Sequence, residues 1–296
     1  MARSGTRGLS LISSSISRHI LRELSEGPKR LDEMWGLSGS PVGTGMPDPD
    51  AVETKITPAG EELLFVAFIL ERWLQNAPKG PLPFGESEAK AVIGALKGGW
   101  TSTVLHGLAA EPRTQTELDR ATGALNSRSL EFHLKEMQRA ELVAARPSDG
   151  EGAIYAVTDW LREGIAPLAV AARWERHHAA AETAPIAGLD VEAAFLLTVP
   201  MLELPAELSG SCRLVVEIDN VGEHRQAGVT VWVEDGQVAS CAVDLQAEAD
   251  AFAIGPASAW LDAVIEADTH DIRLGGDREL ARALLTELHV TLFGIR

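Results

Sequence analysis

Two stretches of this chain follow the same plan, and the first of them is shorter. In each copy a threonine is followed sixteen residues later by a tryptophan: Thr57 and Trp73, then Thr158 and Trp174. Upstream, residues 20–24 align with residues 104–108. The offset between the copies is 84 residues there and 101 at the threonines, so the second copy has 17 additional residues. That length accommodates one helix and a turn, which indicates a duplicated module with a helix missing from one copy.

The shorter copy, residues 1–76, is predicted to consist mainly of helices. Residues 9–25 form the first helix, which Gly27-Pro28 ends, and residues 36–50 hold four Gly and three Pro. Gly and Pro oppose helix by about 1 and about 3 kcal/mol each, so we predict no recognition helix in residues 36–50. Residues 52–57 alternate as a strand does. Thr57 and Pro58 then form a helix start, and residues 63–74 suggest a buried helix.

The longer copy, residues 88–180, follows a proline-rich linker at residues 77–87. Its pattern predicts helices at 88–96, 100–110, 115–121 and 127–140, a hairpin of residues 142–145 and 153–157, and a last helix after Thr158. Thr114 and Glu117 have the spacing of a capping box at the start of the third helix. This order of helices followed by a two-stranded wing is typical of a winged helix-turn-helix domain.

The last part of the chain, residues 186–296, changes character. Short strands are predicted at 214–218, 228–234, 238–243 and 251–254, with Asp235-Gly236 as a hairpin turn. Residues 184–208 are expected to form a leading helix ended by Pro200 and Pro205, and helices are expected at 257–267 and 277–292. The predicted fold class is therefore α+β, with two winged helix-turn-helix modules, the first truncated, before a small mixed α+β sheet domain that we expect to hold an apolar cavity.

The net charge of −17 is concentrated at the end of the chain, where residues 179–296 hold six Lys and Arg and 20 Asp and Glu. That part should repel nucleic acid, while the nearly neutral remainder can still present a basic face. No run of eighteen apolar residues is present, so we expect no membrane partner. Cys212 and Cys241 are expected to be reduced thiols, which fits a cytoplasmic location.

A family resemblance extends over residues 92–178. The residues that carry it are Gly99-Trp100-Thr101, Leu105, Leu108, Pro112-Arg113, Glu117-Leu118, Leu130, Leu134, Leu142-Val143, Tyr155, Val157-Thr158 and Trp174. Their order and spacing resemble the HxlR-type winged-helix regulators of bacteria, relatives of the MarR group. The wing departs from the family pattern, because Tyr155-Ala156-Val157-Thr158 follows an acidic, Gly-rich loop. Residues 18–74 look like a degenerate copy of the same module.

A second resemblance covers residues 186–294. The strand hairpin, the helix with Trp260-Leu261 and the segment Gly275-Gly276-Asp277 resemble the sterol-carrier-protein-type domain appended to some actinobacterial regulators. This resemblance implies a hydrophobic tunnel for an apolar ligand. The large apolar residues Trp232, Phe252, Trp260 and Phe293 are the candidates to line it, although they could equally fill a core.

The candidate DNA-binding residues lie on and around the helix predicted at 127–140. They are Arg113, Asn126, Ser127, Arg128, Ser129, His133, Lys135 and Arg146. Arg can read guanine through two hydrogen bonds, and Lys can contact phosphate. The alternative is a solvated helix face in a protein–protein module, which Glu131 and Glu136 favour because carboxylates near phosphates lower affinity.

No metal site, cofactor or catalytic residue is expected. His177 and His178 end a helix where cations suit its dipole, and adjacent residues on a helix point in different directions. The segment 268–271 is interpreted as a polar loop. Neither a phosphate-binding Gly-rich loop nor a CxxC or His-Glu-x-x-His motif is present, so we expect that the protein is not an enzyme.

These patterns together predict a cytoplasmic transcription regulator that forms a homodimer. Its second copy would bind double-stranded DNA, its first copy would serve as a scaffold, and its acidic C-terminal domain would bind an apolar small molecule. Two alternatives stay open: a protein that binds or sequesters a small molecule and has lost DNA recognition, and an interaction module.

Overall fold

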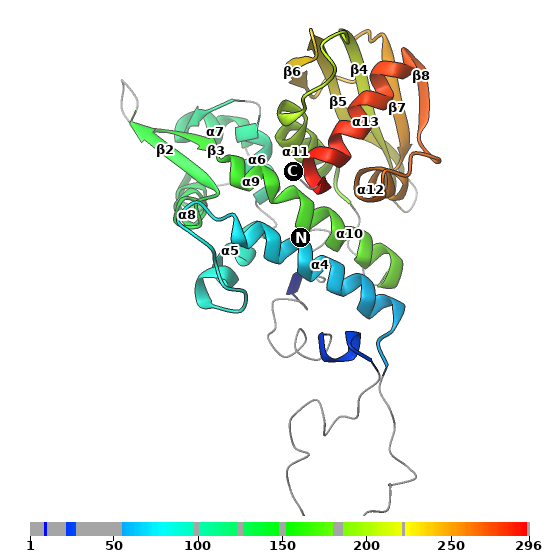
Figure 1. Ribbon diagram of the computed structural model, residues 1–296. Helices are drawn as coiled ribbons and strands as arrows, with labels where there is room; N and C mark the ends of the chain where they lie inside the picture. The colour runs from blue at the N-terminus through cyan, green and yellow to red at the C-terminus, as the bar shows by residue number, and fades with distance from the viewer. Residues whose placement is uncertain are drawn as a thin grey trace, which may run out of the picture.

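The structure is a computed structural model of mixed α+β type (Figure 1). It describes residues 9–10, 22–27, 55–97, 101–109, 111–122, 127–147, 152–179, 186–220 and 223–294. The predictions for residues 36–50, for most of the helix at 9–25 and for residues 52–54 therefore lie outside the described residues. Residues 55–57 are in no regular element, so the described end of the strand predicted at 52–57 is not a strand. Across the described ranges, no helix has both the length and the apolar character needed to span a membrane.

The two repeated threonines begin equivalent helical segments. The Thr57 hydroxyl accepts a hydrogen bond from Gly60 N at 3.2 Å at the start of α4 (Pro58–Gln75), which confirms the predicted N-cap. The Thr158 hydroxyl accepts one from Leu161 N at 3.2 Å at the start of α9 (Asp159–Glu163). The second copy then breaks at Gly164 before α10 (Ile165–His178), whereas α4 is continuous.

Helices α4 and α10 pack against each other through equivalent residues of the two copies (Figure 1). Trp73 Nε1 donates to the Trp160 carbonyl at 2.7 Å, and Trp174 Nε1 donates to the Ala59 carbonyl at 2.7 Å. The repeat offset of 101 residues converts the first bond into the second. The helices therefore run antiparallel, and the duplicated segments pair within one chain about an approximate twofold axis.

One end of this pairing carries an additional aromatic contact. Trp73 and Trp160 stack with ring centroids 4.6 Å apart, and Trp160 Nε1 donates to the Trp73 carbonyl at 3.0 Å. A Cβ atom at Gly164 would lie 3.2 Å from the Trp73 ring and 2.9 Å from the Leu161 carbonyl oxygen. A larger residue at Gly164 would therefore disturb this stack, since contacts at these distances are tighter than Cβ atoms normally make.

The remainder of the second copy confirms its predicted helices and hairpin. The elements are α5 (Ser87–Lys97), α6 (Thr101–Ala109), β1 (Arg113–Thr114), α7 (Gln115–Thr122), α8 (Ser127–Arg139), β2 (Val143–Pro147) and β3 (Ala153–Val157). Strand β1 was not predicted, and it pairs with β3 in a small sheet of order β1-β3-β2. The capping box is confirmed, because Glu117 accepts from Thr114 N at 2.8 Å while Thr114 Oγ1 accepts from Glu117 N at 3.3 Å.

The C-terminal part places helices against a five-stranded sheet of order β6-β5-β4-β7-β8. Its elements are α11 (Gly188–Thr198), the 3-10 helix η2 (Val199–Met201), β4 (Gly210–Asn220), β5 (Glu223–Glu234), β6 (Gln237–Ala242), β7 (Ala251–Pro256), α12 (Ala257–Glu266), β8 (Arg273–Gly276) and α13 (Arg278–Phe293). Strands β4 and β7 are parallel, and the other neighbours are antiparallel. The four predicted strands and both late helices are confirmed. The leading helix is shorter than predicted, because α11 ends at Thr198.

The sheet also explains the state of the two cysteines. Cys212 on β4 and Cys241 on β6 both pair with Val231 on β5, so one strand lies between them. Two strand spacings amount to roughly 9–10 Å, which exceeds the separation that a disulfide can bridge. Both are free thiols, as predicted, and burial raises the pKa of each to about 12.

We expect the tryptophan hydrogen bonds between α4 and α10 to contribute measurably to stability. Trp73→Phe and Trp174→Phe should each lower the free energy of unfolding by about 1–3 kcal/mol, because each removes a buried donor from its carbonyl partner. Urea denaturation followed by circular dichroism measures the effect. Trp232→Phe, in a half-buried tryptophan of β5, is the control. Losses no larger than that of the control would contradict the importance of these bonds.

Candidate functional site

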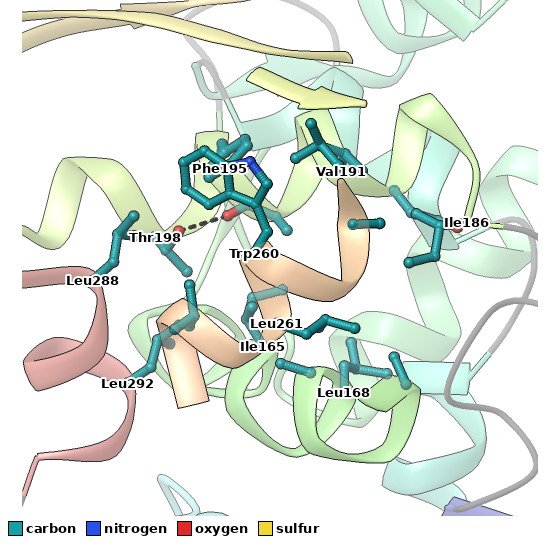
Figure 2. A pocket seen from close by; sticks show the side chains of 17 residues that line it. Ile165, Leu168, Ile186, Val191, Phe195, Thr198, Trp260, Leu261, Leu288 and Leu292 are labelled. Atoms are coloured by element: carbon teal, nitrogen blue, oxygen red, sulfur yellow. Dashed lines mark hydrogen bonds between the residues drawn. The ribbon is translucent and has the colours of Figure 1, made fainter. Parts of the chain in front are cut away.

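An apolar cavity of about 160 Å³ lies where α10 of the second copy meets the C-terminal part (Figure 2). Its walls come from α10, α11, α12, α13 and β4. The lining residues are Ile165, Leu168, Ala169, Ala172, Ile186, Asp190, Val191, Ala194, Phe195, Thr198, Val216, Ala257, Trp260, Leu261, Val264, Leu288 and Leu292. Half-buried residues such as Ile186, Val191 and Leu261 form its rim.

Three of the wall helices line the cavity with the same sequence spacing. Each contributes residues at positions i, i+3, i+4 and i+7, which is one face of a helix. The sets are Ile165, Leu168, Ala169 and Ala172 on α10; Val191, Ala194, Phe195 and Thr198 on α11; and Ala257, Trp260, Leu261 and Val264 on α12. The space arises because each of these sets contains one or two alanines, which leave room that larger side chains would fill.

Two polar groups of the cavity wall, the Thr198 hydroxyl and the Trp260 indole, are already bonded to the protein, and Asp190 is the one charged residue of the lining. The Thr198 hydroxyl donates to the Ala194 carbonyl at 2.8 Å, and the Trp260 indole donates to the Val215 carbonyl at 2.8 Å. Phe195 packs edge-on against Trp260, with ring centroids 5.1 Å apart. A ligand in this cavity would therefore be held mainly by apolar contact, because the lining apart from Asp190, Thr198 and the Trp260 indole is apolar. A dry cavity of about 150 Å³ holds benzene, so the size suits a single aromatic ring or a short branched chain.

Only one of the four residues predicted to bind the ligand lines this cavity. Trp260 does, whereas Trp232, Phe252 and Phe293 are not among the lining residues. Trp232 pairs with Ser211 and Phe252 pairs with Arg213, which places both on the sheet face opposite Val216. The prediction selected large aromatic residues, but space remains where side chains are small.

The cavity lies at a junction that polar contacts reinforce. Arg173 on α10 reaches two carboxylates of α12: its Nε lies 2.7 Å from Asp262 Oδ1, and its Nη1 lies 2.7 Å from Glu266 Oε1. Burial acts to lower the pKa of Arg173, but hydrogen bonds to both carboxylates raise it, so the guanidinium stays charged. Arg162 also donates to the Leu197 carbonyl of α11 at 2.7 Å.

Helix α11 links this cavity to the helices of the second copy. It packs on α6 as well as on β5, and His106 Nε2 of α6 lies 3.1 Å from Glu192 Oε2 of α11. The cavity walls are therefore in direct contact with the part of the chain that carries α7 and α8.

A second candidate surface is the exposed side of α8. Arg128, Phe132, Lys135 and Arg139 lie at positions i, i+4, i+7 and i+11 and are all exposed, so they form one stripe along the helix. Lys135 lies 2.5 Å from Glu131, and Arg139 lies 2.5 Å from Glu136. Phe132 is 59% exposed and was not among the predicted residues, although its apolar ring between basic positions was visible in the sequence.

The other predicted DNA-binding residues have different environments. Arg146 is exposed on β2, whereas Arg113 on β1 is half-buried and lies 3.1 Å from Glu111. Ser127 begins α8, Ser129 is half-buried in its first turn, and Asn126 lies outside the described residues. Burial lowers the pKa of His133, against the opposing effect of Glu136, so the imidazole is neutral at neutral pH and adds no positive charge to this surface.

Comparisons with protein-family models, with curated proteins and with solved structures found no match for this chain. A function must therefore be supported by the apolar cavity, by the exposed stripe of α8 and by the helix contacts that connect them.

Filling the cavity should abolish the binding of small apolar molecules. We expect benzene or indole at ten times its dissociation constant to stabilise the protein by about 1.4 kcal/mol, which raises the melting temperature by about 2–4 °C in a protein of this size. Ala194→Leu should remove this shift, because the added carbons occupy the cavity. Thermal denaturation with and without the compound measures it.

The matched control is Ala91→Leu, which makes the same change on the exposed face of α5. It should keep the full shift. An equal shift in Ala194→Leu, or none in the unaltered protein, would contradict binding in this cavity.

Proposed function

We propose that this protein is a transcription regulator that binds double-stranded DNA through its second copy and responds to a small apolar molecule in the cavity beside α10. The observation that supports DNA binding most is the exposed stripe of α8 within the order α5, α6, β1, α7, α8 and the β2–β3 hairpin. That order is the one expected of a winged helix-turn-helix, in which the second helix of the pair would enter the major groove.

The side chains of the α8 stripe suit a DNA groove. Arg128 in the first turn is placed to read a base edge, and Phe132 can contact a thymine methyl group. Lys135 and Arg139 can exchange their intrahelical carboxylate partners for phosphates, since exposed ion pairs of this kind contribute about 0–1 kcal/mol. We also propose Arg146 on β2 as a phosphate contact of the wing.

The first copy acts in this proposal as a scaffold. Its helix α4 covers one face of α10 through Trp73 and Trp174, so that face is not available to a second chain. The homodimer that we propose would therefore form through another surface.

Ligand binding would change the affinity for DNA through the helices α10 and α11. A molecule in the cavity contacts α10, which follows the hairpin, and α11, which packs on α6. It alters DNA affinity only if it binds the DNA-competent and the DNA-incompetent arrangement with different affinities. The cavity lies between the second copy and the C-terminal part, so a shift of α10 would change the volume of the cavity. The two arrangements of the protein would then bind the ligand with different affinities.

One observation favours an alternative function. Both Lys135 and Arg139 already have carboxylate partners on their own helix, which reduces the net positive charge of the α8 stripe. A protein that sequesters an apolar molecule without binding DNA would show this feature, and the DNA measurement below separates the two functions.

The DNA proposal predicts distinct effects of two substitutions in α8. Arg128→Ala should weaken binding to the preferred duplex by roughly 1–3 kcal/mol, with less effect on unrelated DNA, if Arg128 reads a base. Lys135→Ala should weaken binding to all sequences and lower the salt dependence by about one phosphate contact. Fluorescence anisotropy with a duplex selected by the protein from a random pool measures both.

Arg278→Ala removes the same charge as Arg128→Ala from the exposed start of α13, far along the chain from α8, and should leave DNA affinity unchanged. Failure of the protein to bind any duplex at low salt would support the sequestering function instead.

A further inference from the structure

Three potential metal ligands from the two copies meet at one end of the α4–α10 pair. Glu62 lies in the first turns of α4, and His177 and His178 are the last residues of α10. Their ligand atoms all lie within 4.8 Å of one another. Glu62 Oε2 is 3.5 Å from His177 Nδ1 and 3.2 Å from His178 Nε2. Glu62 is 115 and 116 positions from the two histidines in the chain, so only the pairing of the copies brings it to them.

These distances are close to those between ligands of a tetrahedral zinc ion. Two ligand atoms each about 2.0–2.1 Å from Zn²⁺ at a tetrahedral angle are roughly 3.3 Å apart. Two imidazoles and one carboxylate are also a ligand set that zinc uses, with a fourth position left for water. All three side chains are accessible to solvent, with exposed fractions of 37%, 22% and 40% for His177, His178 and Glu62.

The adjacency of the two histidines does not prevent joint binding. His177 presents its near ring nitrogen, Nδ1, and His178 presents its distal one, Nε2, so the two rings reach Glu62 from different directions. Their planes are 83° apart with centroids separated by 6.0 Å, and the His178 ring also lies against Trp174. From the sequence we expected adjacent side chains to point in different directions. That expectation did not consider that one histidine can use its near ring nitrogen and the other its distal one.

We propose that Glu62, His177 and His178 form a binding site for a divalent zinc-type transition-metal ion that joins the two copies. The ion would tie the start of α4 to the end of α10, one turn from the bond between Trp174 and the Ala59 carbonyl. Such a site binds the folded pair and not the separated helices, so the metal stabilises the fold. This inference is independent of DNA binding and of the apolar cavity.

Calorimetric titration of the untagged protein with Zn²⁺, and absorption spectroscopy with Co²⁺, test the site directly. We expect one ion per chain, a higher melting temperature with Zn²⁺, and visible Co²⁺ bands of a low-coordinate nitrogen and oxygen site. Mg²⁺ should not substitute, because it prefers oxygen ligands in octahedral geometry. Glu62→Gln and His178→Ala should each weaken Zn²⁺ binding at least tenfold and reduce the thermal shift.

His270→Ala, which removes an exposed histidine 2.8 Å from Asp271, is the matched control and should retain full binding. Absence of Zn²⁺ binding in the unaltered protein would overturn the proposal and leave Glu62 as a simple partner of the two histidines. Equal binding in His178→Ala would overturn it as well, since the ion would then occupy another place.

Discussion

Two indole hydrogen bonds, one buried and one partly buried, fix how the halves of this chain meet. An indole N–H removed from water requires an acceptor, and a carbonyl with two lone pairs can serve an indole as well as its own helix. Trp73 of the first copy donates to the Trp160 carbonyl of the second copy, and Trp174 of the second copy donates to the Ala59 carbonyl of the first. Because both bonds must form together, they set the register and the antiparallel direction of α4 and α10, and the remaining contacts of α10 follow from that position.

Helix α10 consequently joins the first copy to the C-terminal part, because it contacts α4 as well as α11, α12 and α13. One face packs on α4, another lines the apolar cavity, and Arg173 ties it to Asp262 and Glu266 of α12. A ligand in the cavity and the proposed metal ion would both contact this one helix. That arrangement gives a physical route by which occupation of the cavity could alter the surface of α8, without any new contact between ligand and DNA.

The sequence predicted those features that depend on neighbouring residues. The N-cap at Thr57, the capping box of Thr114 and Glu117, and the hairpin turn at Asp235-Gly236 are local, and all are present. The features that it missed depend on segments far apart. The cavity requires three distant helix faces, and Glu62 reaches His178 only after the copies pair. Strand β8 was missed because Gly275 and Gly276, which were interpreted only as the segment before the last helix, serve as the partners of β7.

We propose that the apolar cavity and the candidate DNA-binding surface of α8 are coupled through α10. The most direct test is to measure the affinity for a selected DNA duplex by anisotropy, with and without saturating indole, in the unaltered protein and in Ala194→Leu. We expect indole to change the DNA affinity at least fivefold, the lower end of typical coupling between sites, and to leave the DNA affinity of Ala194→Leu unchanged. An identical DNA affinity with and without bound indole would contradict the claim.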